Sequence, residues 1–141
     1  MADLPAEVHR RIRILCAEGD TLANKNEYPA ALERYGEAWE LLPEPQTQWP
    51  AATWILAAIG DARFQSKDFK AGADALTTAM ECPDSDGNPF LHLRLGQCLF
   101  ELGELDRAAF ELAQAAMSVG LDIFDHEDGK YVGFLRSRLG P

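Results

Sequence analysis

Three glycines recur along the chain, and each is followed by the same series of large and small residues. Gly60 follows Gly19 by 41 positions, and Gly96 follows Gly60 by 36 positions. A large apolar residue stands nine positions after each glycine, a small residue at twelve, a bulky residue at sixteen and an alanine at nineteen. These residues are Tyr28, Ala31, Tyr35 and Ala38, then Phe69, Gly72, Leu76 and Ala79, then Leu105, Ala108, Leu112 and Ala115. Such a period predicts a stack of similar units rather than one irregular core.

The segments between these positions favour helix and carry almost no strand signal. The chain is rich in Ala, Leu and Glu, and no run of β-branched residues alternates with polar ones. Breaks such as Pro43-Glu44-Pro45 and Ser66-Lys67-Asp68 separate the helical segments, while Pro50 and Pro89 suit the first turn of a helix. We therefore expect an all-α fold with helices over residues 6–24, 28–42, 50–65, 69–81, 89–101, 105–118 and 129–138.

The repeated pattern resembles the tetratricopeptide repeat, a helix hairpin of about 34 residues. The resemblance implies an α-solenoid of antiparallel helix pairs that forms a single domain over residues 1–141. Its repeats lie at about 12–45, 53–86 and 89–120, with a cap at about 121–139. The small residues allow close approach within a hairpin, and the bulky residues are expected to fill the gap to the neighbouring hairpin. One departure is that Leu15, Leu56 and His92 stand where the family usually has tryptophan.

The segment after Gly120 combines an acidic turn with a short amphipathic helix. Tyr131, Phe134, Leu135 and Leu139 have helical spacing, which predicts a cap over the apolar face of the last hairpin. The order of an acidic pair, Lys-Tyr and Phe-Leu also resembles the C-terminal segment of small bacterial tetratricopeptide immunity proteins from polymorphic toxin systems. That resemblance implies a protein that binds a toxin.

Composition and motifs exclude several classes of function. Thirteen basic and twenty-three acidic residues give a net charge of −10, which disfavours binding to nucleic acid or to anionic membranes. Neither an export signal nor a membrane span is recognisable, and three widely spaced cysteines (16, 82 and 98) predict no disulfide framework or zinc site. Because motifs for catalysis, cofactors or metal are also lacking, we expect a cytoplasmic protein that is not an enzyme.

Candidate binding residues follow from the family register, which places certain positions of each first helix on a concave groove. These candidates are Arg13, Asp20, Asn24, Trp54, Asp61, Phe64, Gln65, Phe90, Gln97, Phe100 and Glu101. Aromatic side chains flanked by polar groups are typical anchors of protein interfaces. A second interpretation remains open for the aromatics, in which they pack under the N-terminal segment, the turn at residues 45–49 or the C-terminal cap.

These features favour a non-catalytic protein-binding module with another protein as its partner. The first hypothesis is an immunity protein that binds and neutralises a basic toxin domain. The alternative is an adaptor or secretion chaperone that holds a peptide segment in the groove. A homo-oligomer whose groove is filled by its neighbour is a remoter possibility. A second, weaker candidate surface is the acidic turn with Asp125, Glu127 and Asp128.

Overall fold

The computed structural model describes residues 3–140, which form an array of α-helices without a strand among them. Two 3₁₀ turns interrupt the series. The helices are α1 (Ala6–Asn24), α2 (Tyr28–Glu40), α3 (Pro50–Gln65), α4 (Phe69–Ala79), α5 (Pro89–Glu101), α6 (Leu105–Val119) and α7 (Gly129–Leu139), and the turns are η1 (Gln46–Gln48) and η2 (Leu121–Phe124). The all-α prediction is confirmed, and every predicted helix end lies within two residues of the observed one.

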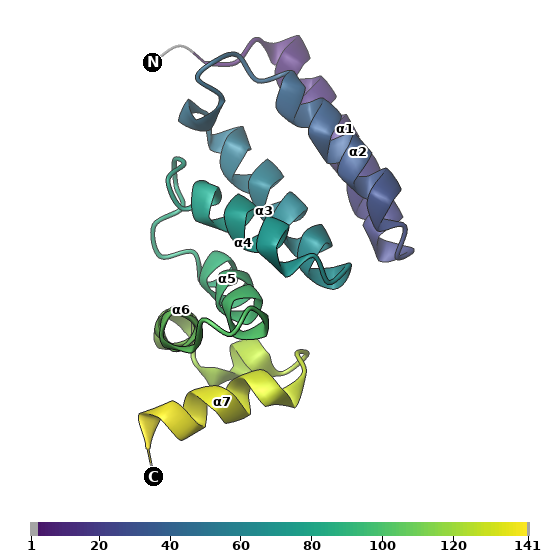
Figure 1. Cartoon of the computed structure of the whole chain (residues 1–141). Helices are drawn as coiled ribbons and strands as arrows, with labels where there is room; N and C mark the ends of the chain where they lie inside the picture. Colours follow the sequence, from purple (N-terminus) through teal and green to yellow (C-terminus); the bar gives the residue numbers. More distant parts are fainter. Residues whose placement is uncertain (1–2, 141) are drawn as a thin grey trace.

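The first six helices form three hairpins that stack in chain order (Figure 1). Helix α1 packs on α2, α3 on α4 and α5 on α6. The first helices of neighbouring hairpins also meet, since α1 contacts α3 and α3 contacts α5. Successive hairpins are rotated, so that the stack curves from the N-terminal pair to α7. Within residues 3–140 no helix combines the length and the apolar content that crossing a bilayer requires.

The same tight turn closes each hairpin. Asn26, Lys67 and Gly103 each stand seven positions after a repeated glycine, and each adopts a positive φ of 62°, 67° or 81°. The next backbone N–H then donates back to a carbonyl five residues earlier, at 2.8–2.9 Å in all three hairpins. This bonding satisfies carbonyl groups at the end of the first helix. The repeat therefore extends to backbone geometry at a position where the side chains differ.

Each repeated glycine makes room for the bulky residue of its own hairpin. A Cβ built on Gly19 would lie under 3.0 Å from the Tyr35 ring, and one on Gly96 would lie equally close to Leu112. Gly60 meets Leu76 in the same way. These contacts correct the expectation that the bulky residue at position sixteen fills the gap to the neighbouring hairpin. It packs inward against the glycine instead, since only a glycine leaves the space for it there.

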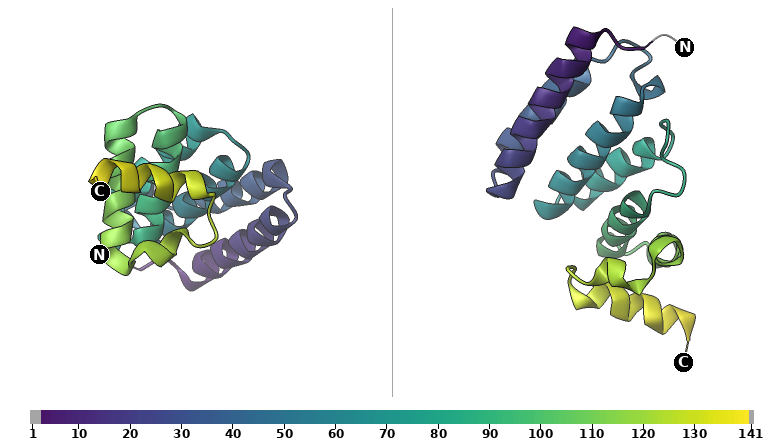
Figure 2. Two further views of the ribbon diagram at one scale, coloured as in Figure 1. Left: turned by 90° about the horizontal axis from the view of Figure 1, so that it is seen from below. Right: turned by 180° about the vertical axis from the view of Figure 1, so that it is seen from behind.

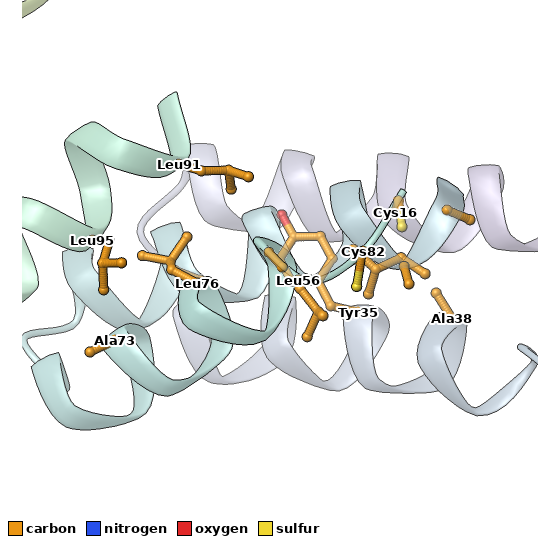
Figure 3. Packing of buried hydrophobic residues seen from close by; sticks show 14 of the residues in the cluster. Cys16, Tyr35, Ala38, Leu56, Ala73, Leu76, Cys82, Leu91 and Leu95 are labelled. Carbon is orange, nitrogen blue, oxygen red and sulfur yellow. The ribbon is translucent and has the colours of Figure 1, made fainter. Parts of the chain in front are cut away.

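A continuous apolar core runs through the hairpins. It extends from Ile12 in α1 to Ala108 in α6, and Figure 3 shows the part that contains Tyr35, Leu56 and Leu76. A polar bond holds the linker between the first two hairpins. The Trp49 indole N–H donates to the Pro43 carbonyl at 2.8 Å.

Helix α7 closes the C-terminal end of the stack, where it lies across α5 and α6 (Figure 2). Tyr131 and Leu135 are buried in a second cluster with Leu112 and Ala115 of α6. Leu139, which the spacing also assigned to the buried face, is 69% exposed because it stands at the last position of the helix. The cap is therefore built from the first two turns of α7.

Candidate protein-binding groove

The predicted groove residues lie on α1, α3 and α5, but they divide into two regions. We call the region of His9, Arg13, Asp20 and Trp54 the open half, because its side chains line surface cavities between α1 and α3. We call the region around Arg94 the closed half. It contains Asp61, Phe64, Phe90, Gln97, Phe100 and Glu101, which contact Arg94, the turn before α7 or α7 itself.

Arg94 is the centre of the closed half and is only 8% exposed. Its Nε donates to Asp61 Oδ1 at 2.7 Å, and its Nη1 donates at 2.7 Å to both Gln97 Oε1 and Glu127 Oε1. Gln97 adds a fourth bond, from its Nε2 to Glu127 Oε1 at 2.8 Å. Because burying a charge is costly unless it is paired and hydrogen-bonded, this network compensates the burial of the guanidinium.

Two aromatic rings complete the surroundings of Arg94. The guanidinium carbon lies 4.9 Å from the centroid of the Phe64 ring and 5.2 Å from that of Phe90. A cation at these distances is attracted by the electron-rich faces of the rings. Phe64 and Phe90 thus contact a charge of the same chain.

Helix α7 covers the remaining aromatic residue of the closed half. The Phe100 ring lies 5.5 Å from the ring centre of Tyr131 and 5.0 Å from that of Phe134, with both pairs edge to face. Phe64 lies 6.2 Å from Tyr131 as well. The second interpretation, in which aromatics pack under the cap, describes the surroundings of Phe64 and Phe100.

Glu101 is held by two side chains of α7. The Tyr131 hydroxyl donates to Glu101 Oε2 at 2.6 Å, and Lys130 Nζ lies 2.8 Å from the same oxygen. Burial opposes the charged carboxylate, but the hydrogen bonds from Lys130 and Tyr131 outweigh it and lower the pKa of Glu101. Burial and the bond to Glu101 raise the pKa of Tyr131.

Trp54 is the exposed aromatic of the open half. Its side chain is 38% exposed, and its ring stands edge to face with His9 at 6.5 Å. Two adjoining cavities of about 470 and 400 Å³ share these two residues. We call the pair of cavities the Trp54 cleft, which is lined by Asp3, Leu4, Ala6, His9, Arg13, Cys16, Ala17, Asp20, Trp49, Pro50, Ala51 and Trp54.

Asp20 lies at the far end of the Trp54 cleft. Its Oδ1 accepts a hydrogen bond of 2.6 Å from the Tyr35 hydroxyl. Burial raises the pKa of Tyr35, and that hydrogen bond and the charges of Asp20 and Asp61 raise it further. Asp20 is therefore bonded to the hydroxyl group of the second helix of its own hairpin. Asn24 and Gln65 are exposed at the ends of these helices, and neither lines the cleft.

The three residues of the acidic turn do not act together. Asp125 is exposed, while Asp128 caps α7 by accepting the Lys130 backbone N–H at 3.0 Å. Glu127 points into the closed half, where Arg94 and Gln97 bind it. Only part of the turn therefore forms an exposed acidic surface.

Sequence reasoning missed Arg94, because the family register skips its position when it selects groove residues. A signal was present, since Arg94 is the only Lys or Arg in the helix segment from Pro89 to Glu101. A lone cation on a helix with a largely buried surface needs a partner. The partner, Glu127, is 33 residues away, and nothing in the local sequence indicates it.

The remaining candidate groups have structural surroundings. All three cysteines are buried and free, and burial raises the pKa of Cys16 and Cys98 to about 12, which disfavours reactive thiolates. His92 Nδ1 lies 2.9 Å from Glu111 Oε2 within the third hairpin. Over residues 3–140, no three His, Cys, Asp or Glu side chains are arranged to hold a metal ion.

Comparison with known sequences is uninformative about activity. No family model matches the chain. A stretch of 48 residues is 35% identical to deoxycytidine kinase 2 of Gallus gallus. This match spans 34% of the chain and only 18% of the kinase, so it does not transfer the activity of the kinase.

Comparison with solved structures is informative about the fold. The chain is similar to the first tetratricopeptide domain of Spaghetti (RPAP3) bound to an HSP90 peptide, with a TM-score of 0.71 and 15% identity over 91% of this chain and 90% of that one. It is equally similar to the second such domain of human RPAP3 in complex with an HSP70 peptide (TM-score 0.70, 15% identity, 95% and 98% covered). The Yersinia enterocolitica secretion chaperone SycD, in complex with a YopD peptide, matches with a TM-score of 0.69 and 14% identity. That match covers 89% of this chain and 90% of the SycD chain. The chain therefore has the fold of tetratricopeptide repeat domains.

Proposed function

We propose that this chain is a non-catalytic protein-binding module that binds and neutralises a basic toxin domain. In this proposal residues 1–141 form one domain with three repeats and a cap. The observation that carries it is the Trp54 cleft, in which a large aromatic side chain stays 38% exposed between the first two hairpins. Exposed aromatics in concave surfaces are typical anchors for a protein partner.

The solved relatives support the binding of a protein. Each of the three structures named above was determined with a peptide of another protein. Their likeness concerns the fold, so peptide binding is carried to this chain as part of the proposal. The candidate surface is the open half, because the closed half is engaged by the chain's own side chains.

The charge of the chain supports a basic partner. A net charge of −10 accelerates association with a positively charged protein and slows association with an acidic one. Tight blockade of a toxin requires an interface of about 1,600 Å² in total. The open half is the region that we assign to this contact.

The geometry also bears on the alternative of an adaptor or secretion chaperone. The likeness to SycD supports that alternative. However, the turn before α7 occupies the C-terminal half of the groove, which shortens the path for an extended peptide. A short open cleft fits a protruding element of a folded domain better than a long unfolded segment, so we favour the immunity role.

The test is to purify proteins that the chain captures from its own source cells and to co-express each with the chain. We expect capture of a folded basic domain at equal stoichiometry, an association rate that falls with rising salt, and rescue of growth in cells that express that domain. Capture of unfolded secretion substrates alone would establish the chaperone role instead. Absence of any captured protein would overturn both.

A further inference from the structure

The Trp54 cleft is largely apolar beside the Trp54 ring and polar toward Asp20. Leu4, Trp49, Pro50 and Ala51 line the first cavity beside the Trp54 ring, together with the carboxylate of Asp3. The second cavity continues along α1 past Arg13 to Asp20. Apolar lining with a few placed polar groups is the usual composition of a binding pocket.

Asp20 differs from the carboxylates of the closed half. Asp61 is paired with Arg94 and Glu101 with Lys130. Among the ion pairs of residues 3–140, none involves Asp20, whose recorded side-chain partner is the neutral Tyr35 hydroxyl. A cation brought to Asp20 would therefore meet an available carboxylate.

Arg13 sets the position of that cation. It lines the cleft between the His9–Trp54 contact and Asp20, and it forms no ion pair with the described residues. A partner's cation placed beside Arg13 would be repelled, whereas one at Asp20 would not. Seven residues of helix separate the two, which corresponds to roughly 10 Å along α1.

From these observations we propose that the Trp54 cleft binds a partner segment that carries an apolar side chain and, further along, a Lys or Arg. The apolar side chain enters beside Trp54, and the basic side chain reaches Asp20. His9, whose ring stands against Trp54, and Asp20 are eleven helix positions apart, which is roughly 16 Å along α1. An extended chain advances about 3.3 Å per residue, so a spacing of four to five residues, with the length of a Lys or Arg side chain, connects the two groups. The inference rests on the proposed function in one respect, namely that the segment belongs to a protein partner of net positive charge.

The probe is the capped peptide acetyl-Phe-Gly-Gly-Gly-Arg-amide, titrated into the full chain and followed by nuclear magnetic resonance of the tryptophan indole groups. Two matched peptides replace Arg by Glu or Phe by Ala. We expect the Arg peptide to shift the Trp54 indole signal and to bind about fivefold more tightly than the Glu peptide, as one exposed ion pair allows. The Ala peptide should bind at least tenfold more weakly.

Two variants and two controls locate the effect. Asp20→Asn removes the charge but keeps an oxygen that accepts from Tyr35, so it should abolish the preference for Arg over Glu. Glu18→Gln removes the same charge from α1 but lies outside the cleft, where Glu18 pairs with Arg34, and it should keep the preference. Trp54→Ala should weaken peptide binding at least tenfold. Phe110→Ala, which removes an exposed aromatic ring outside the cleft, should leave peptide binding unchanged.

Equal binding of the Arg and Glu peptides to the unmodified chain would overturn the inference, as would equal effects of Asp20→Asn and Glu18→Gln. The circular dichroism spectrum and melting temperature of each variant report whether it folds, and Asp20→Asn tests the inference even if Trp54→Ala unfolds.

The inference and the proposed function can be contradicted separately. A captured basic partner that binds Asp20→Asn and Trp54→Ala undiminished would contradict the inference and the assignment of the contact to the Trp54 cleft, while the neutralising function would stand. Peptide binding without any neutralised toxin would contradict only the function.

Discussion

The open and closed halves of the concave face are built from the same kinds of residues but differ in what covers them. Each half contains a carboxylate that accepts a 2.6 Å hydrogen bond from a tyrosine: Asp20 from Tyr35, and Glu101 from Tyr131. In the open half the tyrosine belongs to the same hairpin, and the cleft stays accessible. In the closed half it belongs to α7, which brings a lysine as well. The type of residue at a groove position therefore does not determine whether a partner can reach it.

The largest expected effect on stability comes from removing α7, which covers the closed half. Truncation after Asp128 deletes α7 and exposes the end of the third hairpin, together with Phe100. Fully buried side chains of this size contribute roughly 1.5–3 kcal/mol each, so the loss of Tyr131 and Leu135 should cost about 3–6 kcal/mol. Urea denaturation followed by circular dichroism measures this free energy of unfolding. An unchanged midpoint would show that α7 does not stabilise the array.

A smaller effect should follow from opening the network around Arg94 while α7 stays in place. Glu127→Ala leaves the nearly buried guanidinium with one carboxylate fewer, which should lower the free energy of unfolding by about 3 kcal/mol. Glu104→Ala is the matched control, since Glu104 pairs with Arg107 at the surface and should cost less than about 1 kcal/mol. An equal decrease in the free energy of unfolding for both variants would mean that the Arg94–Glu127 pair stabilises the fold no more than an exposed ion pair does.

The smallest effect concerns pH and Glu101. Because its pKa is lowered in the folded protein, the stability it provides is present above its pKa in the unfolded chain and is lost as pH falls through its folded-state pKa. Glu101→Gln should therefore cost about 1–2 kcal/mol at neutral pH and reduce the loss of stability on acidification. Denaturation curves measured from about pH 7 to about pH 3 test this. Exposed Glu37 serves as the control, and Glu37→Gln should leave the acid dependence unchanged.

The sequence was sufficient for the helices because local signals specify them. Prolines stand in the first turns of α2, α3 and α5, and small residues recur where two helices touch. The family register also selected Trp54, and its role in a binding groove stays a prediction. The closed half could not be predicted, because the bonds from Arg94 to Glu127 and from Tyr131 to Glu101 join residues 30 or more positions apart. The sequence also did not predict that Tyr35 packs against Gly19 of its own hairpin. The size of a side chain alone does not show which neighbouring helix it contacts.

The bond between Arg94 and Glu127 has a consequence for how such an array can change in evolution. Duplication of a helix pair at the junction of α6 and α7 would carry the turn that holds Glu127 away from α5, and would leave a buried arginine without that carboxylate. Duplication of α3 and α4 leaves one copy beside α5 and keeps the bond. We therefore expect the array to lengthen upstream of α5 at little cost, whereas insertion between α6 and α7 would destabilise it by leaving Arg94 without Glu127.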